Sequence, residues 1–257
     1  MTALITGASA GLGEAFALQL AKQGADLVLV ARSRNKLNLL AETLRGEANG
    51  QVTVLAADLS SADAVDNLIA EVILRDLKID ILVNNAGLGV FEDFLATTFA
   101  QQVQQVDLNV RALVALTHAF APGMVERRCG GVINIASTAA FQPLAGASVY
   151  AASKAFVLSF TEALSLELEK TGVTITAACP GPVATHFFAK MNPTLNAKQM
   201  DQPTPVVRDI LRGFERGERV VYPGKLANRL GTWGARFLPR NMILRLALKT
   251  TSKLNQS

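Results

Sequence analysis

The stretch TALITGASAGLGEAFALQLAKQGADLVLVA, residues 2–31, decides the fold of this 257-residue chain. A short apolar run at 3–6 leads through the turn TGASAGLG at 6–13 into a helical period over about 11–23, and a second apolar run follows at 26–31. Two strands joined by a helix in this way run parallel. The glycines permit a tight turn and let the backbone approach a phosphate where the helix begins. The stretch therefore predicts the first unit of a doubly wound, nucleotide-binding α/β sheet.

The same alternation of strands and helices continues outward from this unit to about residue 222. The strands are apolar on both faces, as in DILV at 80–83, which is typical of a parallel sheet covered by helices on both sides. No linker or repeat divides the chain, so we expect a single Rossmann-like α/β domain over 1–257 with a parallel sheet of about seven strands. The expected helices lie near 35–48, 62–75, 98–127 and 149–170, and the expected strands at 52–56, 79–83, 131–136, 173–178 and 219–222.

Past Pro180 the alternation gives way to an irregular stretch, and a further helix ends near Arg216. We interpret residues of about 182–216 as a substrate lid. Its apolar side chains Phe187, Phe188 and Met191 favour an apolar substrate.

The basic charge of the chain is concentrated at its C-terminal end. The formal net charge is +4, yet eight basic and no acidic residues follow Glu218, so residues 1–218 carry −4. For the basic segment 224–257 we favour a solvated helix face or contact with an acidic neighbouring subunit. Contact with an anionic membrane or a lipid-like substrate is the lesser alternative, for which an apolar set that includes Leu226, Leu230, Trp233 and Phe237 provides a face. Nucleic acid is not expected, because no binding module accompanies the charge.

Cysteine and histidine usage argues against a disulfide framework or a metal site. Cys129 and Cys179 are interpreted as two buried thiols, and His118 and His186 lack the spacing of zinc ligands. The N-terminus carries no cationic segment followed by an apolar leader, and the uncharged stretches are interrupted too often to span a lipid bilayer. We therefore expect a cytoplasmic protein.

The end of the second strand indicates which dinucleotide binds. An Asp or Glu about 20 residues after the glycines would bond a free ribose 2′-hydroxyl, but this position holds Ala31-Arg32, with Arg34 nearby. A guanidinium binds a 2′-phosphate, which a carboxylate would repel. The sequence therefore favours NADP over NAD.

The strongest chemical pattern is YAASK at 150–154, with Ser137 at the end of the preceding strand. Residues four apart share one helix face, so Tyr150 and Lys154 project into the same space. A nearby cation favours a phenolate, and Lys154 is therefore expected to lower the pKa of Tyr150. The hydroxyl of Ser137 would hold a substrate oxygen in place.

Taken together, these residues resemble the short-chain dehydrogenase/reductase family. The resemblance extends over roughly 2–222 and is carried by TGASAGLG at 6–13, Asp58, NNAG at 84–87, Asn109, Ser137, YAASK at 150–154 and PGPVAT at 180–185. The basic segment beyond Pro223 is similar to that of the DltE-like branch of bacterial reductases. Ala10 departs from the basic residue that many NADP-preferring members carry at this position in the loop.

The resemblance implies a role for each matched residue. Tyr150 would be the general acid/base, Lys154 would bond the nicotinamide ribose and Ser137 would orient the substrate oxygen, while Asn109 would hold a proton-relaying water. Asp58 would bond the adenine, although a turn cap is the alternative for Asp58, as a helix N-cap is for Thr185. The expected cofactor contacts are Gly7, Ser9, Gly11, Leu12, Gly13, Arg32, Asp58, Leu59, Asn85, Ala86, Gly87, Tyr150, Lys154, Pro180, Gly181, Val183 and Thr185, with no metal ligand.

The expected function is NADP-dependent, reversible hydride transfer between nicotinamide and a carbonyl or alcohol. The alternative is a non-catalytic NADP-binding sensor or scaffold, which would have little reason to keep the Tyr150 and Lys154 pair. A homodimer or homotetramer is also expected, because the helices near 98–127 and 149–170 resemble the pair that forms dimers in the family.

Overall fold

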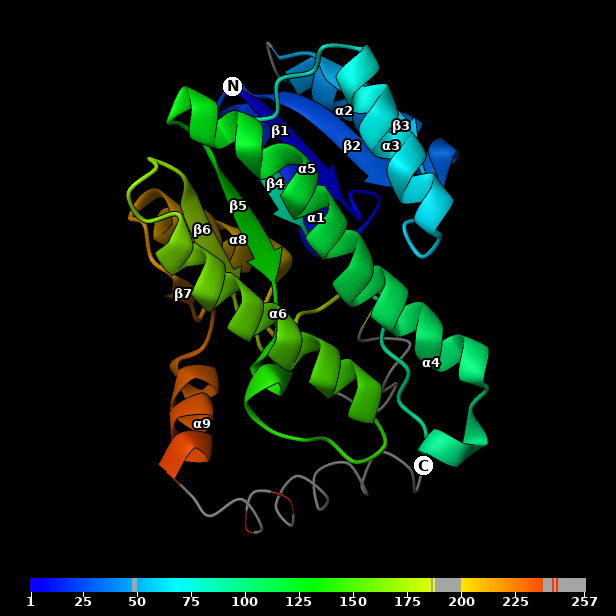
Figure 1. Cartoon of the computed structure of the whole chain (residues 1–257), viewed down its shortest axis with the longest axis vertical. Coiled ribbons are helices and arrows are strands. Elements are labelled where there is room, and N and C mark those ends of the chain that lie inside the picture. Colours follow the sequence, from blue (N-terminus) through cyan, green and yellow to red (C-terminus); the bar gives the residue numbers. More distant parts are fainter. Residues whose placement is uncertain (48–49, 186, 188–199, 238–241, 243, 245–257) are drawn as a thin grey trace.

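Seven parallel strands form one sheet in the order β3-β2-β1-β4-β5-β6-β7 (Figure 1). The computed structural model describes residues 1–47, 50–185, 187, 200–237, 242 and 244. The expected parallel sheet of about seven strands is thus confirmed. The strands are β1 Thr2–Thr6, β2 Asp26–Ala31, β3 Val52–Ala56, β4 Ile81–Asn84, β5 Gly131–Ile135, β6 Thr174–Ala178 and β7 Val220–Val221.

Helices cover both faces of the sheet because successive strand residues point to opposite sides. In β1, Ile5 packs toward α1, α2 and α8, whereas its neighbour Leu4 packs toward α3 and α5. The helices are α1 Gly11–Lys22, α2 Arg34–Glu47, α3 Ala62–Leu74, α4 Phe99–Val106, α5 Ala112–Arg127, α6 Ser148–Glu167, α8 Pro203–Glu215 and α9 Leu226–Phe237, with short helical turns η1 Phe94–Ala96, η2 Asp107–Arg111 and η3 Thr138–Phe141.

The strand order reverses between β1 and β4, which are neighbours in the sheet although β2 and β3 lie between them in the chain. A reversal of this kind opens a crevice beyond the carboxyl ends of the strands, where α/β proteins bind ligands. The turns after β1, β4, β5 and β6 all meet at that edge, so the topology brings distant motifs together.

The helical stretch expected near 98–127 is interrupted by one π-helical turn. The segment η2, Asp107–Arg111, joins α4 to α5 and contains the buried Asn109. Phe99–Arg127 is long and apolar enough to cross a membrane by length and composition. Its apolar residues Leu116 and Met124 are fully buried in the cluster against the sheet, so packing in the core accounts for part of this composition.

One of the two cysteines differs from the expectation. Cys179 is buried, but Cys129 is exposed and the prediction of two buried thiols is wrong for it. Cys129 follows Arg128, which ends α5 in the left-handed conformation with φ of 52° and turns the chain outward before β5 begins.

The segment interpreted as a lid contains a core helix. Within 182–216, α8 buries Val206, Val207 and Ile210 against the sheet and α1, since its apolar residues follow the helical period. Only the part before α8 could therefore cover a site. Phe188 and Met191 of that part, His186, and most of the basic segment after Phe237 lie outside the described residues.

Candidate active site

The turn between β1 and α1 has the backbone geometry that its glycines predict. Gly7 and Gly11 adopt φ of 65° and 63°, in the left-handed region that side chains disfavour. A Cβ on Gly13 would lie 2.2 Å from the backbone oxygen of Gly7, so only glycine lets α1 pack this closely on the turn. The same glycines leave the backbone open to a ligand.

The first turn of α1 is suited to an anion. Its N-cap, Ala10, makes no side-chain hydrogen bond to the helix. Backbone N–H groups at a helix start then remain available, and the helix dipole favours negative charge there. The arrangement fits a pyrophosphate, and the glycine turn fits the close approach that a dinucleotide requires.

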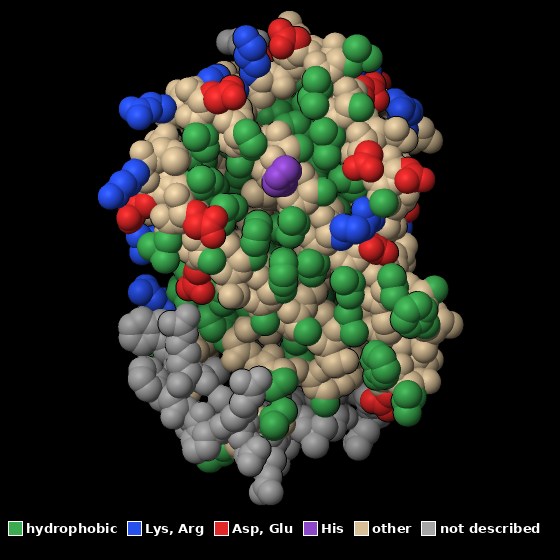
Figure 2. Space-filling view, viewed as in Figure 1, with side chains coloured by type: hydrophobic (Ala, Val, Ile, Leu, Met, Phe, Trp, Pro, Cys, Tyr) green, Lys and Arg blue, Asp and Glu red, His purple; other side chains and the backbone are tan. Residues whose placement is uncertain are grey.

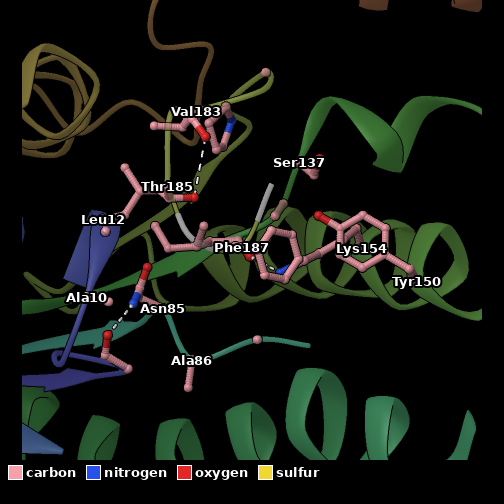
Figure 3. Close-up of a pocket in the computed structure, with 17 residues that line it drawn as sticks. Ala10, Leu12, Asn85, Ala86, Ser137, Tyr150, Lys154, Val183, Thr185 and Phe187 are labelled. Carbon is pink, nitrogen blue, oxygen red and sulfur yellow. Dashed lines mark hydrogen bonds between the residues drawn. The ribbon is translucent and has the colours of Figure 1, made fainter. Parts of the chain in front are cut away.

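A cavity of about 180 Å³ runs from this turn to the start of α6. Figure 3 shows Ala10, Leu12 and Asn85 at one end and Ser137 and Tyr150 at the other. Residues of four different strand ends therefore share one wall, as the topology requires. The cavity is lined by Gly7, Ala10, Gly11, Leu12, Asn85, Ala86, Gly87, Ile135, Ala136, Ser137, Tyr150, Lys154, Pro180, Gly181, Val183, Thr185 and Phe187.

Tyr150 lies in the first turn of α6 and is buried among aromatic rings. The centroid of its ring is 5.1 Å from that of Phe91 and 5.9 Å from that of Phe187. Burial raises the pKa of Tyr150 from 10.0 to about 12, while a hydrogen bond with Ser137 acts in the opposite direction. The phenol is consequently held in its protonated form at neutral pH.

Lys154 lies one helical turn further along α6, as the spacing predicts. Its Nζ donates a 2.7 Å hydrogen bond to the backbone oxygen of Ile135 and is 5.9 Å from the centroid of the Tyr150 ring. Burial lowers the pKa of Lys154 from 10.5 to about 8, and Cys179 acts in the opposite direction. The sequence predicts that Lys154 lowers the pKa of Tyr150, but in this structure burial raises that pKa, and the contact that acts in the opposite direction is the hydrogen bond with Ser137.

Asn109 joins α6 to the loop after β4. Its Nδ2 donates to the backbone oxygen of Leu88 at 2.8 Å and to Ser153 Oγ at 3.0 Å, and its Oδ1 accepts from the Leu88 backbone N–H at 2.8 Å. Asn109 does not line the cavity, but its Oδ1 would lie 3.4 Å from a Cβ on Gly87, which does. Ser153, the fourth residue of YAASK, is a partner that sequence reasoning missed.

Five other residues expected at the cofactor lie outside the cavity. Arg32 is exposed directly after β2, and Asp58 is exposed with its Oδ1 accepting from the N–H and hydroxyl of Ser60 at 3.1 and 2.8 Å. Asp58 therefore forms the turn cap that the sequence left as an alternative. Ser9, Gly13 and Leu59 complete this group, whereas Ile135, Ala136 and Ala10 line the cavity without having been expected there.

Comparison with known proteins identifies the family of the chain. A family model described as short chain dehydrogenase matches residues 1–196. An uncharacterized oxidoreductase of Staphylococcus epidermidis is 36% identical over 183 residues, which cover 71% of this chain and 78% of that protein. The chain belongs to the short-chain dehydrogenase family.

Solved structures of similar proteins agree with this membership. A short-chain dehydrogenase from Sphingobium yanoikuyae in complex with NADPH is 36% identical, with a TM-score of 0.82 and coverage of 91% of this chain and 93% of that one. A bulky-bulky ketone specific alcohol dehydrogenase from Comamonas testosteroni is 33% identical, with a TM-score of 0.80 and coverage of 91% of each chain. This short-chain dehydrogenase is therefore a nicotinamide-dependent oxidoreductase that acts on CH–OH or C=O groups.

Proposed function

We propose that this short-chain dehydrogenase uses NADP to interconvert a carbonyl and an alcohol, with Tyr150 as the general acid/base. One observation carries the proposal: Ser137, Tyr150 and Lys154 line the same cavity as the glycine turn. The phenol therefore lies at the far end of the space that a dinucleotide on Gly7 and Gly11 would occupy.

The proposed roles follow from the chemistry of each side chain. When bound, the nicotinamide supplies a hydride in the reduction and accepts one in the oxidation. In the reduction Tyr150 Oη donates its proton to the substrate oxygen, and the Ser137 hydroxyl donates a hydrogen bond to that oxygen. Lys154 orients the nicotinamide ribose and its positive charge favours the phenolate that Tyr150 becomes. The raised pKa of Tyr150 keeps it in the proton-donating form at neutral pH.

The preference for NADP rests on Arg32 and Arg34. Both are exposed after β2, where no acidic side chain stands to bond a free 2′-hydroxyl. A guanidinium at this point can bind a 2′-phosphate. The NADPH in the similar structure from Sphingobium yanoikuyae supports the same choice.

The substrate we propose is apolar. Phe91 and Phe187 pack on the Tyr150 ring, and Ala139, Ala147 and Leu144 belong to the same cluster. Among the described lining residues, Lys154 carries the only ionisable group that is charged at neutral pH, so no acidic or second basic side chain would hold a charged substrate. The bulky ketones in the name of the similar alcohol dehydrogenase agree with this class.

A homo-oligomer is proposed through the face formed by α5 and α6. Figure 2 shows hydrophobic side chains over the middle of this face, with charged side chains mainly toward its edges. Phe156 of α6 is 41% exposed and stacks on Phe160 with ring centroids 5.8 Å apart. An apolar patch ringed by charge is typical of an interface between subunits.

The experiment is a comparison of Tyr150→Phe with Tyr222→Phe, since the chain contains just these two tyrosines. NADPH oxidation is followed with a panel of neutral ketones, aldehydes and quinones, and NADPH binding is measured by fluorescence titration. We expect Tyr150→Phe to lose roughly 10²–10⁴ in kcat with NADPH affinity little changed, because only the proton donor is removed. Tyr222→Phe keeps its activity.

Two outcomes contradict the proposal in different ways. If Tyr150→Phe retains full activity, another group moves the proton. If the wild type binds NADPH but turns over no carbonyl or alcohol, the non-catalytic NADP-binding module is the better account.

A further inference from the structure

The C-terminal helix α9 presents two different faces. Asn228 and Thr232, four residues apart, face the protein: Thr232 is 3% exposed, and Asn228 Nδ2 donates to Asp201 Oδ2 at 3.0 Å. Leu226 and Leu230, also four apart, are 67% and 61% exposed. Residues two apart on a helix point to nearly opposite sides, so these leucines point away from the protein.

The inner face of α9 is held against the cofactor side of the molecule. A Cβ on Gly181 would lie 2.3 Å from Asn228 Nδ2, so Asn228 sits directly on a residue that lines the cavity. α9 also packs against η3, the turn that follows Ser137. Figure 1 shows α9 beyond the end of the sheet toward which the strands point. The exposed leucines therefore belong to a surface that these contacts fix in position next to the candidate active site.

Positive charge borders these leucines. A second cavity, of about 410 Å³, lies between α8, β7 and α9 and is lined by three arginines, Arg212, Arg216 and Arg229, against the acids Asp209 and Glu218. Arg216 pairs with Glu218 at 2.8 Å, whereas Arg212 forms no ion pair within the described part of the chain. Residues 203–237 contain seven basic and three acidic residues, a net charge of +4, although one of the seven, Arg219, pairs with Glu169 outside this range.

We propose that this C-terminal docking face, made by Leu226, Leu230, Arg212, Arg216 and Arg229, binds an anionic phospholipid membrane surface. Exposed leucines gain by entering the boundary between headgroups and acyl chains, and arginines beside them gain from anionic headgroups. A second copy of the chain is the weaker occupant, because a twofold contact would place the same basic patch against itself. The helix α8, which carries Arg212 and Arg216, also packs on the face of the sheet opposite to α5.

The test is co-sedimentation of the full chain with vesicles of phosphatidylcholine alone or of phosphatidylcholine mixed with phosphatidylglycerol. Binding is expected to the mixed vesicles at low salt and to fall at high salt. Leu226→Ser combined with Leu230→Ser should weaken binding by about tenfold or more, because both exposed apolar contacts are lost. Arg212→Gln combined with Arg216→Gln should weaken it by roughly tenfold as well.

Matched controls lie on the opposite edge of the sheet. Ile73 and Leu74 of α3 are 67% and 87% exposed, and replacement of both by serine removes the same kind of side chain elsewhere. Circular dichroism checks that each variant remains folded. The proposal is overturned if the wild type does not sediment with anionic vesicles, if it binds neutral vesicles equally, or if the α3 control weakens binding as much. It is also overturned if the Leu226 and Leu230 double variant lowers the mass of the oligomer without vesicles, which would assign the face to a second copy.

Discussion

Burial sets the charge of both ionisable side chains in the cavity. Tyr150 is 5% exposed and Lys154 is 6% exposed. Desolvation favours the neutral form of each group, so it raises the pKa of Tyr150 to about 12 and lowers the pKa of Lys154 to about 8. At neutral pH this destabilises the fold only at Lys154, whose charged form is buried, because the neutral phenol of Tyr150 carries no charge to desolvate.

Burial of the charged Lys154 side chain should lower the stability of the fold at neutral pH. The pKa of Lys154 is lower in the folded than in the unfolded chain, so the unfolded chain binds more protons between about pH 8 and 10.5. The free energy of unfolding therefore rises with pH over that window. The same contribution is lost as the pH falls through 8. Lys154→Met should therefore raise the free energy of unfolding at neutral pH by about 2 kcal/mol, after the lost hydrogen bond to Ile135 is deducted. Urea denaturation of both proteins across this pH range measures the difference.

The gain should shrink as pH rises from 8 to 10.5, because the neutral amine of the wild type no longer disfavours folding. A variant less stable than the wild type at neutral pH would contradict the assignment. NADPH binding by Lys154→Met should weaken at the same time.

The proposed preference for NADP is tested at Arg32, the first of the two exposed arginines after β2. Arg32→Asp should weaken NADPH binding by about a hundredfold and strengthen NADH binding, because a carboxylate repels the 2′-phosphate and bonds a 2′-hydroxyl. Lys36→Asp is the matched control, since Lys36 is also exposed and lies nearby in the first turn of α2. Equal effects from the two variants would show that long-range charge, rather than a contact of Arg32, sets the preference.

At the scale of elements, the packing of α1 on the glycine turn depends on Gly13. A Cβ there would meet the Gly7 backbone oxygen at 2.2 Å and Asn85 Nδ2 at 2.7 Å, and backbone cannot yield as a flexible side chain would. Gly13→Ala should lower the free energy of unfolding by about 3 kcal/mol. Thermal denaturation compares it with Gly46→Ala.

Gly46 is the matched control because it is also helical, in α2, and a Cβ there meets nothing within 4 Å. Gly46→Ala should leave stability unchanged or raise it by about 0.5 kcal/mol, since alanine loses less backbone freedom on folding. If Gly13→Ala is tolerated equally, the close approach of α1 to the turn does not require glycine.

The helices and strands were predictable wherever the hydrophobic period was strong. The surroundings of single side chains were not predictable from that period. The apolar runs at 26–31 and 52–56 match β2 and β3 residue for residue, because buried parallel strands need continuous apolar sequence. The π-helical turn at Asn109 was not predicted, because one five-residue turn inside a long apolar helical stretch is too short to stand out in the hydrophobic period. The exposure of Cys129 was not predictable either, because it lies in the turn after α5, where Arg128 adopts a left-handed conformation that the hydrophobic period does not indicate.

The site was predictable to the extent that motifs sit at strand ends. Gly7, Asn85, Ser137 and Thr185 follow four different strands, and the parallel topology brings all four to one cavity. The aromatic contacts of Tyr150 with Phe91 could not be read from the sequence, because Phe91 lies in a loop without a period. The net direction of the Tyr150 pKa also required the burial of the phenol, which spacing alone does not give.

At the scale of the whole molecule, the oligomer can be tested through α6. Phe156→Glu places a charge in the middle of the exposed aromatic pair with Phe160, and burying an unpaired carboxylate opposes association. Light scattering should give a multiple of 27.3 kDa for the wild type and a lower mass for this variant. Leu74→Glu, on the exposed side of α3, should leave the mass unchanged. A wild type of 27.3 kDa would exclude the oligomer.

A crystal structure of this chain with NADP bound would test most directly whether the Tyr150 hydroxyl faces the nicotinamide ring. We expect the pyrophosphate on the backbone of the turn at Gly7 and Gly11, the 2′-phosphate beside Arg32, and the nicotinamide ring at the end of the cavity formed by Ser137, Tyr150 and Lys154. A nicotinamide ring located away from the Tyr150 hydroxyl, with the phenol facing no reactive carbon, would contradict this expectation.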